Sequence, residues 1–130
     1  MGRGISQLFA SHGYRTSVYD PNPDQLEATR RSAGIESGTD GLSSFTKDLA
    51  AAVQSADWVF EAAPEVESVK RQLYRDIAPW LKPDAIVASN TSTFALTKLA
   101  ALSPFPDRLV IAHFFNPAAI IPLVEVVQTS

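Results

Sequence analysis

A chain of 130 residues, 45% hydrophobic and 19% charged, is long enough for one domain with a single buried core and too short for two independent domains. Its 14 acidic and 11 basic residues give a net charge of -3, which argues against a nucleic-acid partner, because phosphate binding needs a clustered basic surface. The chain has no cysteine, which excludes disulfides and thiolate metal sites, and we predict no metal centre.

The beginning of the chain lacks the apolar core of a signal peptide, and no later stretch is long and apolar enough to span a bilayer. We therefore expect a cytoplasmic protein without membrane contact. The expected partner is a small molecule or another protein.

The first part of the chain predicts a helix, a strand and a second helix. Apolar residues at helical spacing predict a helix over 2–12, which Gly13 ends in a left-handed conformation. A β-branched and aromatic run predicts a strand over 16–20. A proline in its first turn begins the helix expected over 23–33, and Gly34 would close that helix.

Short apolar strands and helices alternate through the rest of the chain. After a loop over 34–44 we expect strand 44–46, helix 48–55, strand 58–62, helix 66–81 and strands 85–88, 109–112 and 123–127. The buried face of helix 66–81 would be formed by Val69, Leu73, Ile77 and Trp80. Near-continuous apolar strands must be covered on both faces, so the expected fold class is α/β, with a doubly wound, mostly parallel, Rossmann-like sheet.

Asp20 is the first candidate for a cofactor contact. A strand that ends in an acid shortly after a glycine-led helix is typical of dinucleotide-binding folds, in which the acid accepts hydrogen bonds from the adenosine ribose. No arginine follows Asp20 immediately to receive a 2'-phosphate, which favours NAD over NADP. The alternative is that Asp20 only opens a turn before Pro21.

Three segments of the second half occur in an informative order: EAAPEVESVKRQLY, ASNTS, and HFFNP followed by PLVEVV. Together they resemble the 3-hydroxyacyl-CoA dehydrogenase family, over nearly the whole chain. The opening MGRGISQLFASHGY is similar to the family's glycine-rich turn and first helix, with Gly2 in place of the third glycine. The resemblance implies a partial NAD-binding domain over residues 1–130, without the sheet's first strand and without the family's helical C-terminal domain.

The resemblance also implies which residues carry the chemistry. His113 would remove the proton of the substrate hydroxyl as hydride leaves for NAD, and Glu125 would orient the imidazole and stabilise its charged form. Ser92 would hydrogen-bond the substrate near the nicotinamide. The expected cofactor contacts are Gly2, Asp20, Glu65, Lys70, Asn90 and Asn116.

Each of these residues has a simpler interpretation when the resemblance is set aside. A single histidine after an apolar strand is more often a packed, hydrogen-bonded side chain than a catalytic one. Ser92 and Thr93 would then cap the helix that follows the strand. Glu65 and Lys70 would belong to a solvated helix face.

The implied function is NAD-dependent oxidation of an L-3-hydroxyacyl-CoA, as in fatty-acid β-oxidation or short-chain acyl-CoA metabolism, by a protein that is a homo-oligomer when complete. Only 37 positions separate Asp20 from Asp57, where acyl-CoA members usually carry a longer helical arm that contacts CoA. The ending IPLVEVV also resembles gulonate and carnitine dehydrogenases. The alternatives are a dehydrogenase of a non-CoA hydroxy acid, a non-catalytic truncated remnant, and a regulatory NAD-binding module, which would need neither His113 nor Glu125.

Overall fold

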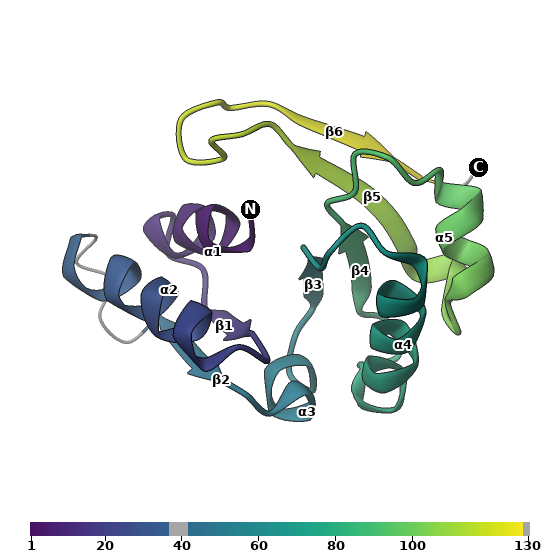
Figure 1. Ribbon diagram of the computed structural model, residues 1–130, viewed down its shortest axis with the longest axis horizontal. Helices are drawn as coiled ribbons and strands as arrows, with labels where there is room; N and C mark the ends of the chain where they lie inside the picture. Colours follow the sequence, from purple (N-terminus) through teal and green to yellow (C-terminus); the bar gives the residue numbers. More distant parts are fainter. Residues whose placement is uncertain (37–41, 129–130) are drawn as a thin grey trace.

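The computed structural model describes residues 1–36 and 42–128, and part of the loop expected over 34–44 lies outside them. Helices and strands alternate along the chain (Figure 1). The helices are α1 (Gly2–Ser11), α2 (Pro23–Glu36), α3 (Leu49–Val53), α4 (Glu67–Ile77) and α5 (Leu96–Leu102), with short 3-10 turns η1 (Ala78–Trp80) and η2 (Pro106–Arg108). The strands are β1 (Thr16–Tyr19), β2 (Ser43–Thr46), β3 (Trp58–Glu61), β4 (Ile86–Ser89), β5 (Leu109–Phe114) and β6 (Val124–Val127). None of the described helices is long and apolar enough to cross a membrane.

The described strands form two sheets. β1 and β2 are parallel, and a second sheet has the order β3-β4-β5-β6, in which only β6 is antiparallel to its neighbour. The expected α/β class with a mostly parallel sheet is confirmed. Among the described strands, β1 pairs only with β2 and β3 pairs only with β4, so the two sheets are not joined by hydrogen bonds between β1 and β3. In a dinucleotide-binding sheet, the position between the strands equivalent to β1 and β3 belongs to the first strand.

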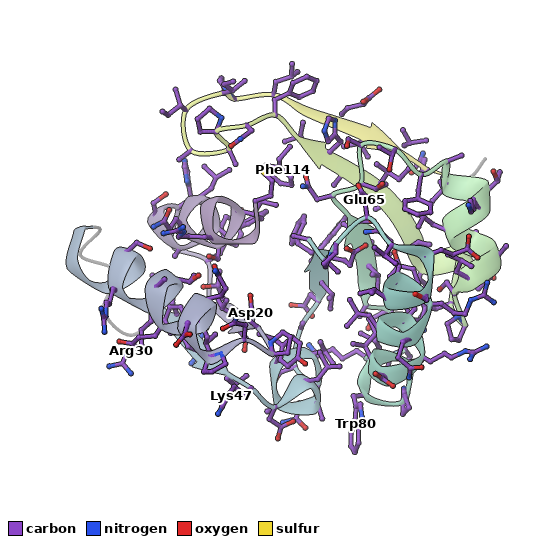
Figure 2. All side chains as sticks on the ribbon, in the orientation of Figure 1. Asp20, Arg30, Lys47, Glu65, Trp80 and Phe114 are labelled. Carbon is purple, nitrogen blue, oxygen red and sulfur yellow. The ribbon has the colours of Figure 1, made fainter. Side chains whose placement is uncertain are left out.

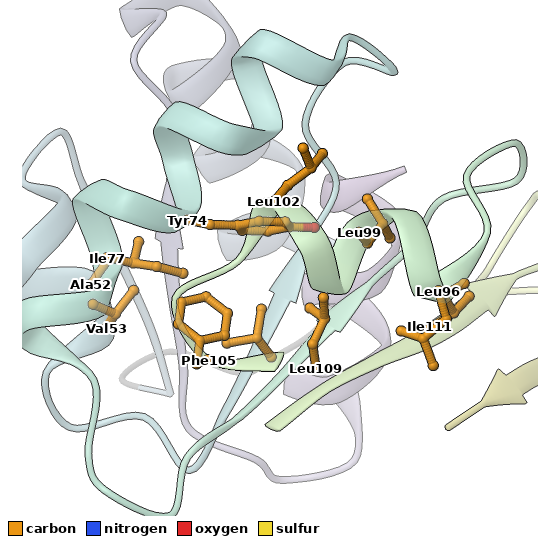
Figure 3. Close-up of a cluster of buried hydrophobic side chains, with 11 residues drawn as sticks. Ala52, Val53, Tyr74, Ile77, Leu96, Leu99, Leu102, Phe105, Leu109 and Ile111 are labelled. Carbon is orange, nitrogen blue, oxygen red and sulfur yellow. The ribbon is translucent and has the colours of Figure 1, made fainter. Parts of the chain in front are cut away.

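Helices cover both faces of the larger sheet, because β4 and β5 alternate two buried sets of side chains. Leu109 and Ile111 of β5 point toward α4 and α5 and join the main core, much of which Figure 3 shows. Ala112 and Phe114 point the other way and pack against Ile5 of α1. By this alternation His113, at the end of β5, lies on the same face as Leu109 and Ile111.

Two glycines predicted to stop helices behave differently. Gly13 has a φ of 83° and follows α1, as predicted. The prediction for Gly34 is wrong, since α2 continues through it to Glu36. Glycine is tolerated inside a helix at a cost of about 1 kcal/mol, so its presence alone does not end one.

The predicted buried face of α4 is also wrong in part. Val69 and Trp80 are 39% and 52% exposed, whereas Lys70, Tyr74 and Ile77 are all at most 2% exposed. The true buried positions are four and three residues apart, as a helical face requires. The alternative that places Lys70 on a solvated helix face is wrong, because its buried ammonium pairs with the buried carboxylate of Glu61 at the end of β3.

Candidate functional site

His113 and Glu125 face each other across the β5–β6 pair. They are opposite residues in the antiparallel register, and Nδ1 of His113 lies 3.7 Å from Oε2 of Glu125. The histidine side chain is 25% exposed and the glutamate 65%. The register follows from the turn that returns the chain from β5 to β6, in which the Phe115 amide donates to the Leu123 carbonyl.

A cavity of about 370 Å³ opens beside His113 at the carboxyl ends of β3, β4 and β5. Parallel sheets bind ligands at this edge because loops there gather side chains from several strands. Five of the predicted site residues line the cavity: Glu65, Asn90, Ser92, His113 and Asn116. Backbone and apolar groups complete the wall, contributed by Met1, Ala62, Ala63, Phe114 and Phe115.

Glu65 connects the loop after β3 to the turn after β4. Its Oε1 accepts a hydrogen bond from the Ser92 amide at 3.0 Å, and its Oε2 accepts one from the Thr91 hydroxyl at 3.0 Å. Burial would raise the pKa of Glu65, but these two hydrogen bonds and the nearby Lys70 ammonium outweigh it and hold the pKa below its ordinary value. Glu65 is therefore an ionised carboxylate on the cavity wall at neutral pH.

The alternative interpretation, in which Ser92 and Thr93 cap α5, is wrong. α5 begins at Leu96 after Ala95, and no side chain caps it. Instead the Thr91 hydroxyl accepts hydrogen bonds from the amides of Thr93 and Phe94, which closes a tight turn directly after β4. This turn leaves the Ser92 side chain exposed on the cavity wall.

The two asparagines differ in how firmly they are held. Asn90 follows β4, and its Oδ1 accepts a hydrogen bond from the Phe114 amide at 2.8 Å. Its own amide donates to the Glu61 carbonyl at 2.8 Å, so Asn90 joins the ends of three neighbouring strands. Asn116 is exposed and precedes Pro117 in the loop after β5. Asn90 thus belongs to the fixed frame of the cavity and Asn116 to its rim.

Three predicted cofactor residues, Gly2, Asp20 and Lys70, do not line this cavity. Gly2 begins α1, where a Cβ would lie 3.5 Å from Cβ of Ala62, an ordinary contact. Asp20 directly follows β1, and Figure 2 shows it well apart from Glu65. Its Oδ1 accepts a hydrogen bond from the Asn22 amide at 2.8 Å, so Asp20 does open the turn before Pro21. That bond leaves acceptor positions of the carboxylate for a ribose.

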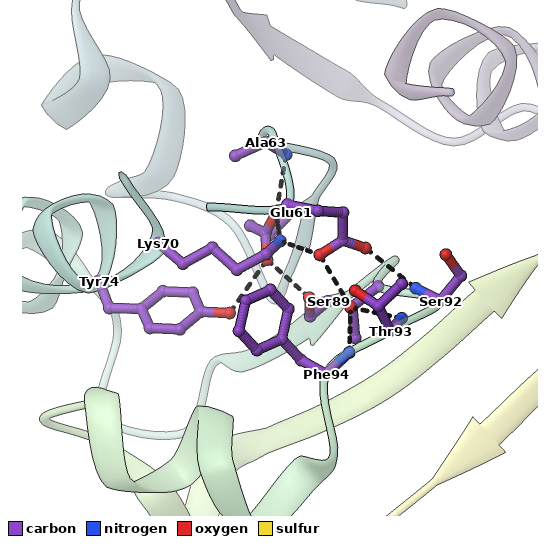
Figure 4. A network of polar contacts seen from close by, with 10 residues as sticks. Glu61, Ala63, Lys70, Tyr74, Ser89, Ser92, Thr93 and Phe94 are labelled. Atoms are coloured by element: carbon purple, nitrogen blue, oxygen red, sulfur yellow. Dashed lines mark hydrogen bonds and ion pairs between the residues drawn. The ribbon is translucent and has the colours of Figure 1, made fainter. Parts of the chain in front are cut away.

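A buried carboxylate behind the cavity was missed in the sequence. Glu61 is 3% exposed, and side chains from α4 and β4 converge on it (Figure 4). Oε1 accepts from the Ala63 amide at 2.7 Å and Lys70 at 2.8 Å, and Oε2 accepts from Lys70 at 3.0 Å, Tyr74 at 3.0 Å and Ser89 at 2.6 Å. Burial and the charge of Glu61 raise the pKa of Tyr74, which keeps its phenol protonated as a donor.

No metal site accompanies this network in residues 1–36 and 42–128, where no three His, Cys, Asp or Glu side chains are grouped to hold an ion. Lys70 pairs with Glu61, and no buried side-chain nitrogen or oxygen among the described residues lacks a hydrogen-bond partner. The buried polar groups are thus satisfied by the chain itself.

Glu65→Gln is expected to lower stability near neutral pH and to have less effect in acid. The depressed pKa of the folded state means that Glu65 stabilises the protein above its ordinary pKa of 4.5 and loses this effect as pH falls through the depressed value. Urea unfolding of both proteins, from about pH 7 down to about pH 3, measures the difference. A difference that stays constant over this range would contradict the assignment.

The chain is similar to known dehydrogenases over nearly its whole length. A family model described as "3-hydroxyacyl-CoA dehydrogenase, NAD binding domain" matches residues 1–130. The chain is 37% identical to 5-formyl-3-hydroxy-2-methylpyridine 4-carboxylate 5-dehydrogenase of Mesorhizobium japonicum, covering 98% of this chain and 45% of that protein. It is 33% identical to a 3-hydroxybutyryl-CoA dehydrogenase of Bradyrhizobium diazoefficiens, with 98% and 48% covered. It is 36% identical to an L-carnitine dehydrogenase of Streptomyces coelicolor, with 98% and 43% covered.

A solved structure supports the same relationship. A crystal structure of a 5-formyl-3-hydroxy-2-methylpyridine 4-carboxylic acid 5-dehydrogenase, described as NAD+ dependent, matches with a TM-score of 0.87 and 36% identity, covering 97% of this chain and 45% of that one. The chain spans about half the length of the curated relatives it matches. The match of the family model to the whole chain and the agreement of the fold show that the chain belongs to the 3-hydroxyacyl-CoA dehydrogenase family, as its NAD-binding domain.

Proposed function

We propose that this chain carries the NAD site and catalytic base of a dehydrogenase that oxidises the 3-hydroxyl of an L-3-hydroxyacyl-CoA. The observation that carries the proposal is the pairing of His113 with Glu125 at the mouth of a cavity that Ser92 also lines. A histidine that was only a packing residue would need neither an opposed carboxylate nor a hydroxyl beside an open cavity.

The residues of the cavity fit the nicotinamide half of NAD. Glu65, which keeps free acceptor positions, suits ribose hydroxyls, and Asn116 on the rim suits the amide of the nicotinamide. Asp20 at the end of β1 suits the ribose of the adenosine half, and Gly2, in the first turn of α1, lies where a pyrophosphate would approach. Bound in this way, NAD supplies the acceptor for the hydride.

The side chains then divide the chemistry between them. Because Nδ1 of His113 faces Glu125, its Nε2 is the ring nitrogen left to take the substrate proton. The hydroxyl proton passes to Nε2 while the hydrogen on the carbon that bears the hydroxyl leaves as hydride, with its electron pair, for NAD. The alcohol thereby becomes a ketone. Ser92 donates to the substrate oxygen and holds it beside His113, while Glu125 stabilises the imidazolium that forms.

A second substrate class, a hydroxy acid without CoA, is favoured by a separate observation. In the described part of the segment between Asp20 and Asp57, the chain forms only α2, β2 and α3, with no further helical arm. The relatives named for carnitine and for a pyridine carboxylate likewise carry names without CoA. The reaction at the hydroxyl carbon would be the same, and only the part of the substrate remote from His113 would differ.

A panel of substrates separates these two candidates. With NAD and the full-length protein, formation of NADH is measured on L-3-hydroxybutyryl-CoA, L-3-hydroxybutyrate and L-carnitine. We expect kcat/KM for the CoA thioester to exceed the others by about a hundredfold or more, since remote binding energy is used in the transition state. Preference for a free acid would establish the second class. No turnover with any of them would contradict the proposal and favour a non-catalytic protein.

A further inference from the structure

Lys70 is too enclosed to contact a ligand in the cavity directly. Its side chain is 1% exposed, and its Nζ donates to both carboxylate oxygens of Glu61, at 2.8 and 3.0 Å. The ring of Phe94 covers the ammonium, with its centroid 5.9 Å from Nζ. These neighbours separate the charge from the cavity that Glu65, Asn90 and Asn116 line.

The ammonium reaches the cavity wall through Glu65. Nζ of Lys70 lies 3.6 Å from Oε2 of Glu65, a side chain that is 36% exposed. The same carboxylate accepts hydrogen bonds from the Thr91 hydroxyl and the Ser92 amide. The contacts therefore run without interruption from Glu61 in the core, through Lys70 and Glu65, to Ser92, which lines the cavity together with His113. Figure 4 shows Glu61, Lys70 and Ser92 of this series.

We propose, on the basis of the function proposed above, that Lys70 is a positioning residue: anchored by Glu61, it holds the carboxylate of Glu65 against the Thr91–Ser92 turn. Glu65 lies between β3 and α4 and is partly solvated, so without a fixed cation beside it the carboxylate would gain more by turning toward water. Held in place, it presents its remaining acceptor positions to the ribose of the cofactor and fixes the backbone of Ser92.

The first test removes the buried pair as a unit. Lys70→Met alone would leave Glu61 charged and unpaired, whereas Glu61→Gln with Lys70→Met replaces both by neutral side chains of similar size, which buried ion pairs often tolerate. In the full-length protein we expect this double variant to bind NAD about tenfold more weakly by calorimetry, an effect of the size of one hydrogen bond.

A double-mutant cycle shows whether Lys70 acts through Glu65. Glu65→Gln leaves the Glu61–Lys70 pair intact and is expected to weaken NAD binding by about the same tenfold factor. Combining it with Glu61→Gln and Lys70→Met should weaken binding no further, because the pair would then have no carboxylate to position. Full additivity would overturn the proposal, as would unchanged NAD affinity in Glu65→Gln, a variant that does not disturb the buried pair.

Lys98→Met is the matched control. Lys98 also approaches the Phe94 ring, at 5.1 Å, and pairs with a glutamate, Glu67, at 3.0 Å, but it is 54% exposed and outside the cavity. We expect its NAD affinity to equal that of the wild type. A loss of NAD affinity as large as that of the double variant, Glu61→Gln with Lys70→Met, would show a general effect of charge and overturn the proposal.

A readout without NAD separates this inference from the proposed function. The pKa of the Glu65 carboxyl, followed by NMR, should rise toward its ordinary value when Glu61→Gln and Lys70→Met remove the cation beside it. An unchanged titration in a folded variant overturns the positioning role even if the wild type binds NAD. If the wild type does not bind NAD, the proposed function fails first and the role in cofactor binding fails with it.

Discussion

Replacing His113 with glutamine is expected to lower kcat/KM of the full-length protein by about a hundredfold to ten-thousandfold, the range that a positioned general base contributes. The fold should survive, because the side chain is a quarter exposed at the end of β5 and the hydrogen bonds of the strand are unaffected. Steady-state rates of NADH formation, with the circular dichroism spectrum as a check on folding, measure the effect.

His12 supplies the control for this substitution, since the chain has two histidines and His12 is the other one. It is exposed after α1, where its Nδ1 contacts the Leu8 carbonyl at 2.8 Å, and it does not line the cavity. His12→Gln should leave kcat/KM unchanged. Equal rates for the two histidine variants would exclude His113 as the base.

Glu125→Gln should lower kcat/KM less than His113→Gln does, by about fivefold to tenfold, because the exposed His113–Glu125 pair is screened by solvent.

Glu61→Ala is expected to lower the free energy of unfolding by about 3 kcal/mol, because it removes the buried counterion of Lys70 and leaves its ammonium only the partly exposed Glu65, at 3.6 Å. It also removes the acceptor of the hydroxyls of Tyr74 and Ser89. Urea unfolding measures the loss as a shift of the midpoint. The neutral double replacement, Glu61→Gln with Lys70→Met, should recover most of the stability.

Glu67→Ala is the control for this loss. Glu67 contacts two cations, Arg71 at 2.8 Å and Lys98 at 3.0 Å, so like Glu61 it is an acid with charged partners. It lies on the surface of α4, where ion pairs stabilise little. Its unfolding midpoint should move far less than that of Glu61→Ala. Similar midpoints for the two variants would contradict the expected cost of removing the buried partner of Lys70.

Much of the fold could be predicted because each strand of the larger sheet is a short apolar run bounded by polar residues. β3 and β4 lie within one residue of their predicted ends, and β5 extends two residues beyond its prediction, through His113 to Phe114. The direction of β6 could not be predicted, because an apolar run reads the same whether its strand is parallel or antiparallel. The register that opposes His113 and Glu125 depends on that direction.

The site was predicted unevenly for related reasons. Five residues that the family resemblance indicated do line one cavity, because they follow strands whose carboxyl ends meet at one edge of the sheet. Glu61 was missed, although a signal exists: an acid ends an apolar strand, and Lys70 shares a helical face with Tyr74 and Ile77. A lysine on an apolar face indicates a buried counterion, which the pattern of hydrophobic residues alone cannot locate.

A crystal structure of the full-length protein with NAD tests the central claim most directly. The account predicts the nicotinamide in the cavity between Ser92 and His113, its ribose within hydrogen-bond distance of Glu65, and the ribose of the adenosine half at Asp20. Contact between the nicotinamide and any other face of the sheet, with the cavity beside His113 left empty, would contradict it.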